Sequence, residues 1–130
     1  MHKAAKAWSL WEGRISKLIQ DPIEETKNKF ENDQFALAFA RIENHYFTNK
    51  GFLPRDGFLI EKPNIDKIRH IPTIIVQGRY DVVCPAVSAY ELKQAFPEAE
   101  LIYTLTGHSG FEKEIISELV KATDKFKSSK

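Results

Sequence analysis

The stretch Ile71–Gly78 constrains the fold more than any other part of the sequence, because four β-branched residues follow one another at 73–76. A strand that is apolar on both faces is typical of the centre of a parallel sheet, covered by helices on each side. A polar loop over 79–85 follows, and then a predicted helix over 86–95 that Pro97 ends. This segment therefore predicts one strand–loop–helix unit.

The same order of elements repeats once before the end of the sequence. We predict a strand over 100–105, a loop over 106–110 and a helix over 111–126. The apolar residues of that last helix recur at helical spacing and are expected to be buried: Ile115, Ile116, Leu119, Val120 and Phe126. Alternating strands and helices indicate an α/β fold with parallel strands.

The sequence before Pro63 has helical periodicity instead. One helix is predicted over 4–19 and a second over 33–47, with Asp33 as the N-cap. Their expected buried stripes are Trp8, Trp11, Ile15, Leu18 and Ile19 in the first and Phe35, Phe39, Ile42 and Tyr46 in the second. We expect the charged residues 23–32 to be solvated and residues 52–63, which carry prolines and a glycine, to form a loop.

Composition excludes several classes of protein. The 130 residues carry 19 basic and 18 acidic side chains, so net charge makes no case for binding nucleic acid. No apolar run is long enough for a membrane span, and the first residues lack the apolar core of a signal peptide. A single cysteine, Cys84, excludes an internal disulfide and favours a cytoplasmic location. His45 and His70 lack partners at metal-ligand spacing, so we expect no metal.

Two polar residues follow the two predicted strands, where open parallel sheets bind their ligands. Asp81 follows the first strand and His108 the second, and neighbouring strands would bring the two loops together. A carboxylate beside an imidazole fixes its tautomer and stabilises the imidazolium, and aspartate before histidine is the chain order of α/β-hydrolases. The alternative is that each residue only forms a turn.

No nucleophile for such a pair is evident in the sequence. Residues 107–111 (GHSGF) fail the Gly-x-Ser-x-Gly pattern, and Ser109 directly follows His108, which is poor geometry for attack. Cys84 as a thiol nucleophile is an alternative, although a small packed cysteine is commoner. If the protein is a hydrolase, this sequence contains the aspartate and the histidine of a catalytic triad but not its nucleophile.

Two glutamates lie beside the apolar stripes of the predicted helices. Glu12 is four residues after Trp8, and Glu43 is four residues after Phe39. A carboxylate facing an apolar surface is costly unless a cation pairs with it, so the two together would suit a ligand ammonium group. The alternative, favoured by periodicity alone, is that each pairs with an arginine such as Arg14 or Arg41 or lies at the solvated edge of its stripe.

Four blocks in one order resemble the C-terminal part of the proline iminopeptidase family, also called prolyl aminopeptidases. They are AAKAWSLWEG (4–13), FALAFARIENHYF (35–47), IRHIPTIIVQGRYDVVCP (68–85) and PEAELIYTLTGHS (97–109). The resemblance covers nearly the whole chain. It implies a serine peptidase of the α/β-hydrolase fold that releases N-terminal proline from peptides without a metal or organic cofactor.

The resemblance also implies roles for single residues. Asp81 matches the triad aspartate and His108 the triad histidine. Glu12 and Glu43 match carboxylates of a helical cap that hold the free α-amino group of the substrate. Cys84 matches a cysteine near the active site that is not the nucleophile.

The implied architecture is a part of the whole family fold. Residues 1–63 would form most of the helical cap, and residues 64–130 the last two parallel strand–helix units of the α/β-hydrolase core. The serine elbow and the oxyanion loop are not among these residues, so we expect no peptidase activity from this chain alone. We also expect marginal stability, or a homodimer that covers the exposed sheet edge.

Two other functions stay open at this point. One is a non-catalytic truncated binding protein that recognises peptide amines or a partner chain; the presence of both Asp81 and His108 argues against it. The other is a different α/β-hydrolase such as an esterase or epoxide hydrolase. The blocks that contain Glu12 and Glu43 argue against that function, because an ester substrate needs no amine receptor.

Overall fold

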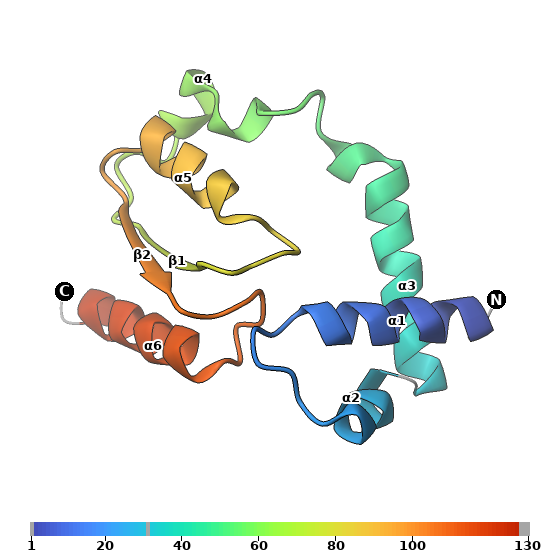
Figure 1. The fold of residues 1–130 in the computed structure, drawn as a ribbon. Coiled ribbons are helices and arrows are strands. Elements are labelled where there is room, and N and C mark those ends of the chain that lie inside the picture. Colours follow the sequence, from blue (N-terminus) through green and yellow to red (C-terminus); the bar gives the residue numbers. More distant parts are fainter. Residues whose placement is uncertain (1, 31, 128–130) are drawn as a thin grey trace.

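A computed structural model describes residues 2–30 and 32–127 of the chain. Figure 1 shows a helical region and a small sheet flanked by helices. Along the chain the elements are α1 (His2–Ile15), α2 (Ile23–Phe30), α3 (Asp33–Thr48), the 3-10 helices η1 (Lys50–Phe52) and η2 (Phe58–Ile60), α4 (Lys62–Ile65), β1 (Ile74–Gly78), α5 (Ala86–Ala95), β2 (Glu100–Thr104) and α6 (Lys113–Lys127).

The two strands pair in parallel, as the alternation of strands and helices predicts. Their register runs from Ile74 opposite Glu100 to Gly78 opposite Thr104. Helix α5 lies on one side of the pair and α6 on the other, and both contact β1 and β2 (Figure 1). The α/β fold class is therefore confirmed.

The pairing continues past the ends of the strands. The backbone N–H of Arg79 donates to the Thr104 carbonyl over 2.8 Å, and that of Tyr80 donates to the Thr106 carbonyl over 3.0 Å. Gly78 is buried where the loop after β2 crosses it, and a Cβ there would lie 1.9 Å from the Gly107 carbonyl oxygen. The two loops therefore leave the sheet side by side.

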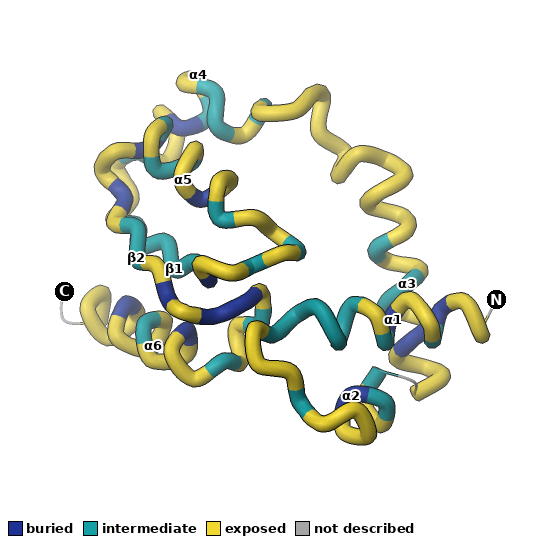
Figure 2. Tube along the Cα trace, in the orientation of Figure 1, coloured by how far each residue is buried: buried dark blue, intermediate teal, exposed yellow. Residues whose placement is uncertain are grey.

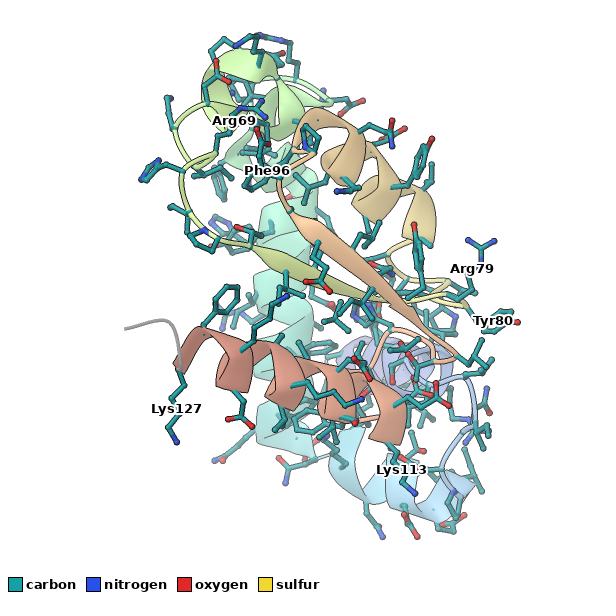
Figure 3. All side chains as sticks on the ribbon, turned by 90° about the vertical axis from the view of Figure 1, so that its left-hand side faces the viewer. Arg69, Arg79, Tyr80, Phe96, Lys113 and Lys127 are labelled. Atoms are coloured by element: carbon teal, nitrogen blue, oxygen red, sulfur yellow. The ribbon has the colours of Figure 1, made fainter. Side chains whose placement is uncertain are left out.

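The core lies at the opposite end of the sheet. Ile65, Phe96 and Ala99 are almost completely buried, and partly buried Ile75 and Leu92 pack against them. Figure 3 shows Phe96 with Arg69 at this end, far from Arg79 and Tyr80. A small core closes the amino ends of the strands and leaves their carboxyl ends to the loops.

The helical region is held where α1 crosses α3. Ala5, Ser9 and Ala36 are buried there, and the Ser9 hydroxyl donates to the Ala36 carbonyl over 3.4 Å. Small side chains allow two helices to approach closely, as the dark segments of Figure 2 show at this crossing. The N-cap of α3 is Asn32, whose side chain accepts from the Phe35 N–H over 3.1 Å, so the prediction of Asp33 as the cap is wrong by one residue.

Several predicted element boundaries need correction. Helix α1 ends at Ile15, four residues before the predicted end, because the Ser16 carbonyl accepts from the Ser109 N–H over 2.7 Å and the chain turns toward that loop. The charged stretch after Pro22 forms α2, which is mostly exposed. The predicted loop 52–63 contains the short η2 and the start of α4.

The predicted apolar stripes of the helices are largely exposed. Trp11 is 50% exposed, Ile42 60% and Val120 53%, although each lies on the stripe expected to be buried. Ile115 of α6 is buried, as predicted. The other buried residues of α1, α2, α3 and α6 lie outside the predicted stripes and are alanines, Ser9 and Thr26. Periodicity shows which side of a helix is apolar, but whether another element covers that side depends on the rest of the fold.

Candidate active site

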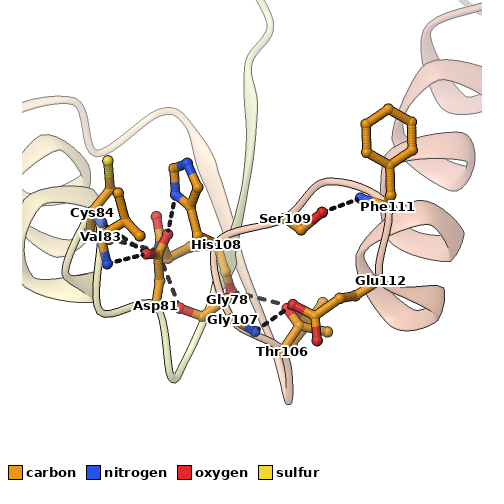
Figure 4. Close-up of polar contacts among 12 residues, drawn as sticks. Gly78, Asp81, Val83, Cys84, Thr106, Gly107, His108, Ser109, Phe111 and Glu112 are labelled. Atoms are coloured by element: carbon orange, nitrogen blue, oxygen red, sulfur yellow. Dashed lines mark hydrogen bonds and ion pairs between the residues drawn. The ribbon is translucent and has the colours of Figure 1, made fainter. Parts of the chain in front are cut away.

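Asp81 sits in the tight turn that follows β1, with its side chain only 6% exposed. One carboxylate oxygen, Oδ1, accepts the backbone N–H groups of Val83 and Cys84 over 2.9 and 2.8 Å. The turn that an Asp forms with its own following backbone fixes the direction of the carboxylate. The second oxygen, Oδ2, is left to face the neighbouring loop (Figure 4).

His108 meets that second oxygen. Its Nδ1 lies 3.1 Å from Asp81 Oδ2, and the imidazole is 40% exposed. Gln77 Nε2 also donates to Oδ2 over 3.3 Å and to the Cys84 carbonyl over 3.2 Å. With the proton on Nδ1, Nε2 is the ring nitrogen that accepts a proton from another group.

Glu12 approaches this pair from the helical region. It lies on α1 and is partly buried, and burial raises the pKa of its carboxyl group above the usual value. Repulsion by Glu43 raises this pKa further, while a positive charge on His108 lowers it. Glu12 of α1 is therefore within electrostatic range of Glu43 on α3 and of His108 in the loop after β2.

Glu43 is held by an aromatic partner. The Trp8 indole Nε1 donates to Glu43 Oε2 over 2.5 Å. Arg14, one possible partner for the glutamates, instead donates to the Asp21 carbonyl over 2.8 Å and to the Gln20 side chain. Glu43 therefore has Trp8 as its partner, and no contact of either glutamate with Arg14 is seen among the described residues. The amine receptor formed by Glu12 and Glu43 stays a prediction.

Known proteins share this sequence over almost its full length. It is 56% identical over 128 residues to a probable proline iminopeptidase of Leptolyngbya boryana and 55% identical over 128 residues to a proline iminopeptidase of Arabidopsis thaliana. The corresponding enzyme of Neisseria gonorrhoeae is 47% identical over 122 residues. The matches cover 98%, 98% and 93% of this chain. The chain is a sequence relative of proline iminopeptidases.

The chain spans 39% of the Leptolyngbya protein, 33% of the Arabidopsis protein and 36% of the Neisseria protein. A solved serine hydrolase involved in carbazole degradation aligns with the whole chain at a TM-score of 0.56 and 19% identity, over 48% of its own length. That likeness supports the fold, a C-terminal portion of an α/β-hydrolase. No protein-family model matches the chain.

The similarity to proline iminopeptidases extends through both parts of the site, since it covers the helices and the strands alike.

Cys84 lies beside this site. Burial raises the pKa of its thiol, and the charges of Asp81 and Glu12 raise it further. Because the thiolate is the reactive form, this environment disfavours Cys84 as the nucleophile.

Ser109 is unsuited to attack in this arrangement. Its hydroxyl accepts the Phe111 N–H over 3.3 Å, and its backbone N–H donates to the Ser16 carbonyl.

In the part of the chain that the structure describes, no group of three or more histidine, cysteine or acidic residues is placed to hold a metal ion. Nor is any helix of that part long and apolar enough to cross a membrane.

Some contacts of the site were not predicted. Gln77 supports Asp81 from within the strand, and its sequence signal is a single polar residue in an apolar run. The Trp8 indole donates a hydrogen bond to Glu43. In the sequence, only the spacing of four residues between Trp8 and Glu12 places Trp8 on the same helix face as a candidate site residue. Glu112 binds the backbone before His108, and no local pattern marks it.

Proposed function

We propose that this chain provides the histidine, the aspartate and the amine-binding carboxylates of a serine-type prolyl aminopeptidase. The observation that carries the proposal is the Asp81–His108 contact with Glu12 in electrostatic range, in a chain similar to proline iminopeptidases. The nucleophilic serine would come from a part of the parent polypeptide outside these 130 residues. The single cysteine supports a cytoplasmic location.

The proposed reaction uses His108 twice. The serine oxygen attacks the prolyl carbonyl carbon while His108 Nε2 takes the serine proton, and His108 then gives that proton to the leaving amine as the bond to it breaks. Water next attacks the prolyl ester, again losing a proton to His108, and proline is released as the serine regains its proton. Asp81 holds His108 and stabilises the imidazolium in both steps.

Glu12 and Glu43 would select the substrate. A peptide with a free N-terminal proline carries a secondary ammonium group, and two partly buried carboxylates attract such a cation. An acylated N-terminal proline carries no positive charge. The proposal therefore predicts hydrolysis of peptides with an uncapped proline and poor hydrolysis of N-acetylated ones.

The test is hydrolysis of L-prolyl-p-nitroanilide by a polypeptide that contains these residues and the serine. We expect His108→Ala to lower kcat by about 10⁴-fold, because the general base is lost. His70→Ala is the matched control, since His70 is exposed and lies near the core end of the sheet. An active His108→Ala variant would exclude the assigned base.

The 130-residue chain by itself provides a second test. We expect no turnover of the prolyl substrate from it, because neither Ser109 nor Cys84 is placed as a nucleophile. Turnover by this chain that disappears in His108→Ala would mean that the nucleophile lies within these residues. Binding of prolyl peptides without turnover by the parent polypeptide would favour the alternative of a binding protein.

A further inference from the structure

The carboxylate of Glu112 joins two backbone segments that are far apart in the sequence. Oε1 accepts the Gly107 N–H over 2.7 Å, and Oε2 accepts the Leu18 N–H over 3.2 Å. Gly107 directly precedes His108, and Leu18 lies just beyond the end of α1. Figure 4 shows Glu112 reaching the backbone beside His108.

The two segments are packed closely around this carboxylate. Gly107 is buried, and a Cβ at this position would lie 2.7 Å from the Leu18 nitrogen and 3.2 Å from Glu112 Oε1. Two residues after Gly107 and two residues before Leu18, the Ser109 N–H donates to the Ser16 carbonyl over 2.7 Å. The contact is therefore a built junction between the end of α1 and the His108 loop.

A charged acceptor makes this junction strong. Hydrogen bonds from backbone N–H groups to a carboxylate are about twice as strong as bonds between neutral groups. Loss of the carboxylate would leave the buried Gly107 N–H without its acceptor, which is costly. A glutamine at this position puts an NH2 group in place of one of the two carboxylate oxygens, where it faces a backbone N–H group and cannot accept from it.

We propose that Glu112 is a positioning residue that holds His108 in a set relation to α1, the helix that carries Glu12. This inference rests on the proposed function, because it concerns the distance between the group that accepts the proton and the group that binds the substrate amine. Misplacement of about 1 Å between such groups lowers rates by up to about 100-fold.

Glu112→Gln tests the proposal, and Glu114→Gln is the matched control. Glu114 is also a glutamate at the start of α6, and its Oε2 accepts a single N–H, that of Leu105, over 3.0 Å. The control thus removes one carboxylate at the start of α6 and leaves the junction with Leu18 unchanged.

Two substrates separate positioning from stability. L-prolyl-p-nitroanilide needs both His108 and Glu12, whereas p-nitrophenyl acetate has no amine and needs only His108. For Glu112→Gln in the polypeptide that carries the serine, we expect kcat/KM to fall about 10-fold or more for the prolyl substrate and less than about 3-fold for the ester. Glu114→Gln should lower neither by more than about 3-fold.

An equal loss for both substrates, or an equal loss in both variants, would overturn the positioning role. Amide hydrogen exchange measures the junction without any turnover. Exchange at Gly107 and Leu18 should be at least about 10-fold faster in Glu112→Gln and unchanged in Glu114→Gln. Unchanged exchange in Glu112→Gln would refute the junction, whereas a wild-type protein with no prolyl turnover would refute the proposed function alone.

Discussion

At Glu12, burial and a neighbouring carboxylate act together on one side chain. Both raise the pKa of the Glu12 carboxyl group, and the effect of His108 in lowering it is smaller. The folded state therefore holds a proton on Glu12 at pH values where the unfolded chain has lost it. Such a carboxylate favours any ligand that brings a positive charge.

The first prediction at the residue scale follows from this pKa. In the folded protein Glu12 binds its proton more tightly, so its contribution to stability is present at low pH and is lost as pH rises from the ordinary glutamate value through the raised one. Glu12→Gln should remove this part of the pH dependence and raise the free energy of unfolding above that window relative to the wild type. Urea titrations at a series of pH values measure it.

The control for this experiment is Glu25→Gln, which changes an exposed glutamate on α2. We expect its unfolding midpoints to follow those of the wild type across the same pH range. If Glu12→Gln also follows the wild type, neither burial nor repulsion by Glu43 raises the pKa of Glu12 in solution.

At the scale of elements, the end of β1 decides whether the site forms. Asp81 and His108 meet because the loops after the two strands continue the pairing of the sheet. Gly78 permits this continuation, since any side chain there would meet the backbone at Gly107. The requirement comes from close approach and not from backbone conformation, because Gly78 lies within β1 and its φ is not positive.

The second prediction concerns this glycine. Gly78→Ala should lower the free energy of unfolding by about 2–3 kcal/mol, because overpacking forces the backbone at Gly107 to shift. It should also separate His108 from Asp81, which is measured as a change in the imidazole NMR shifts of His108. Gly110→Ala is the control, because a Cβ at Gly110 meets no atom within 4 Å. Equal stability of the two variants would contradict the packing at Gly78.

At the scale of the whole molecule, apolar surface is the main feature. Large apolar side chains are exposed on α1, α3 and α6, among them Trp11, Ile42 and Val120. The strand pair is also narrow, and the sheet consists of β1 and β2 in the described residues. Exposed apolar patches and free strand edges promote association between chains.

The third prediction is that the 130-residue chain self-associates. Sedimentation velocity over a wide range of concentrations should show dimers or larger species at the upper end. Ile42→Lys should shift the equilibrium toward the monomer, because a charge on the apolar face of α3 opposes its burial. Lys121→Ala, an exposed change on α6, is the control. A monomer at all concentrations would contradict this prediction and the expected homodimer.

The two strands could be predicted from local sequence, because the β-branched run at 73–76 and the mostly apolar residues 101–105 favour strands. It also determined α5, whose bounds agree with the prediction, since the preceding proline and Phe96–Pro97 limit it locally. The four sequence blocks indicated a similarity to proline iminopeptidases, and relatives at 47–56% identity confirm that similarity. These features depend on local preference and on motifs that are read residue by residue.

The remaining features depend on contacts between segments that are far apart in the chain. Helix α1 ends early because a loop more than ninety residues away binds its end, and Glu112 closes that contact. In our proposal the position of Glu12 relative to His108 depends on the same Glu112 contact. The spacing of residues within α1 cannot predict that position. The apolar stripes are largely exposed, which their spacing could not predict, because amphipathic spacing shows only which side of a helix is apolar. What covers the face is a property of the elements around it, and contacts between distant segments are set by the fold as a whole.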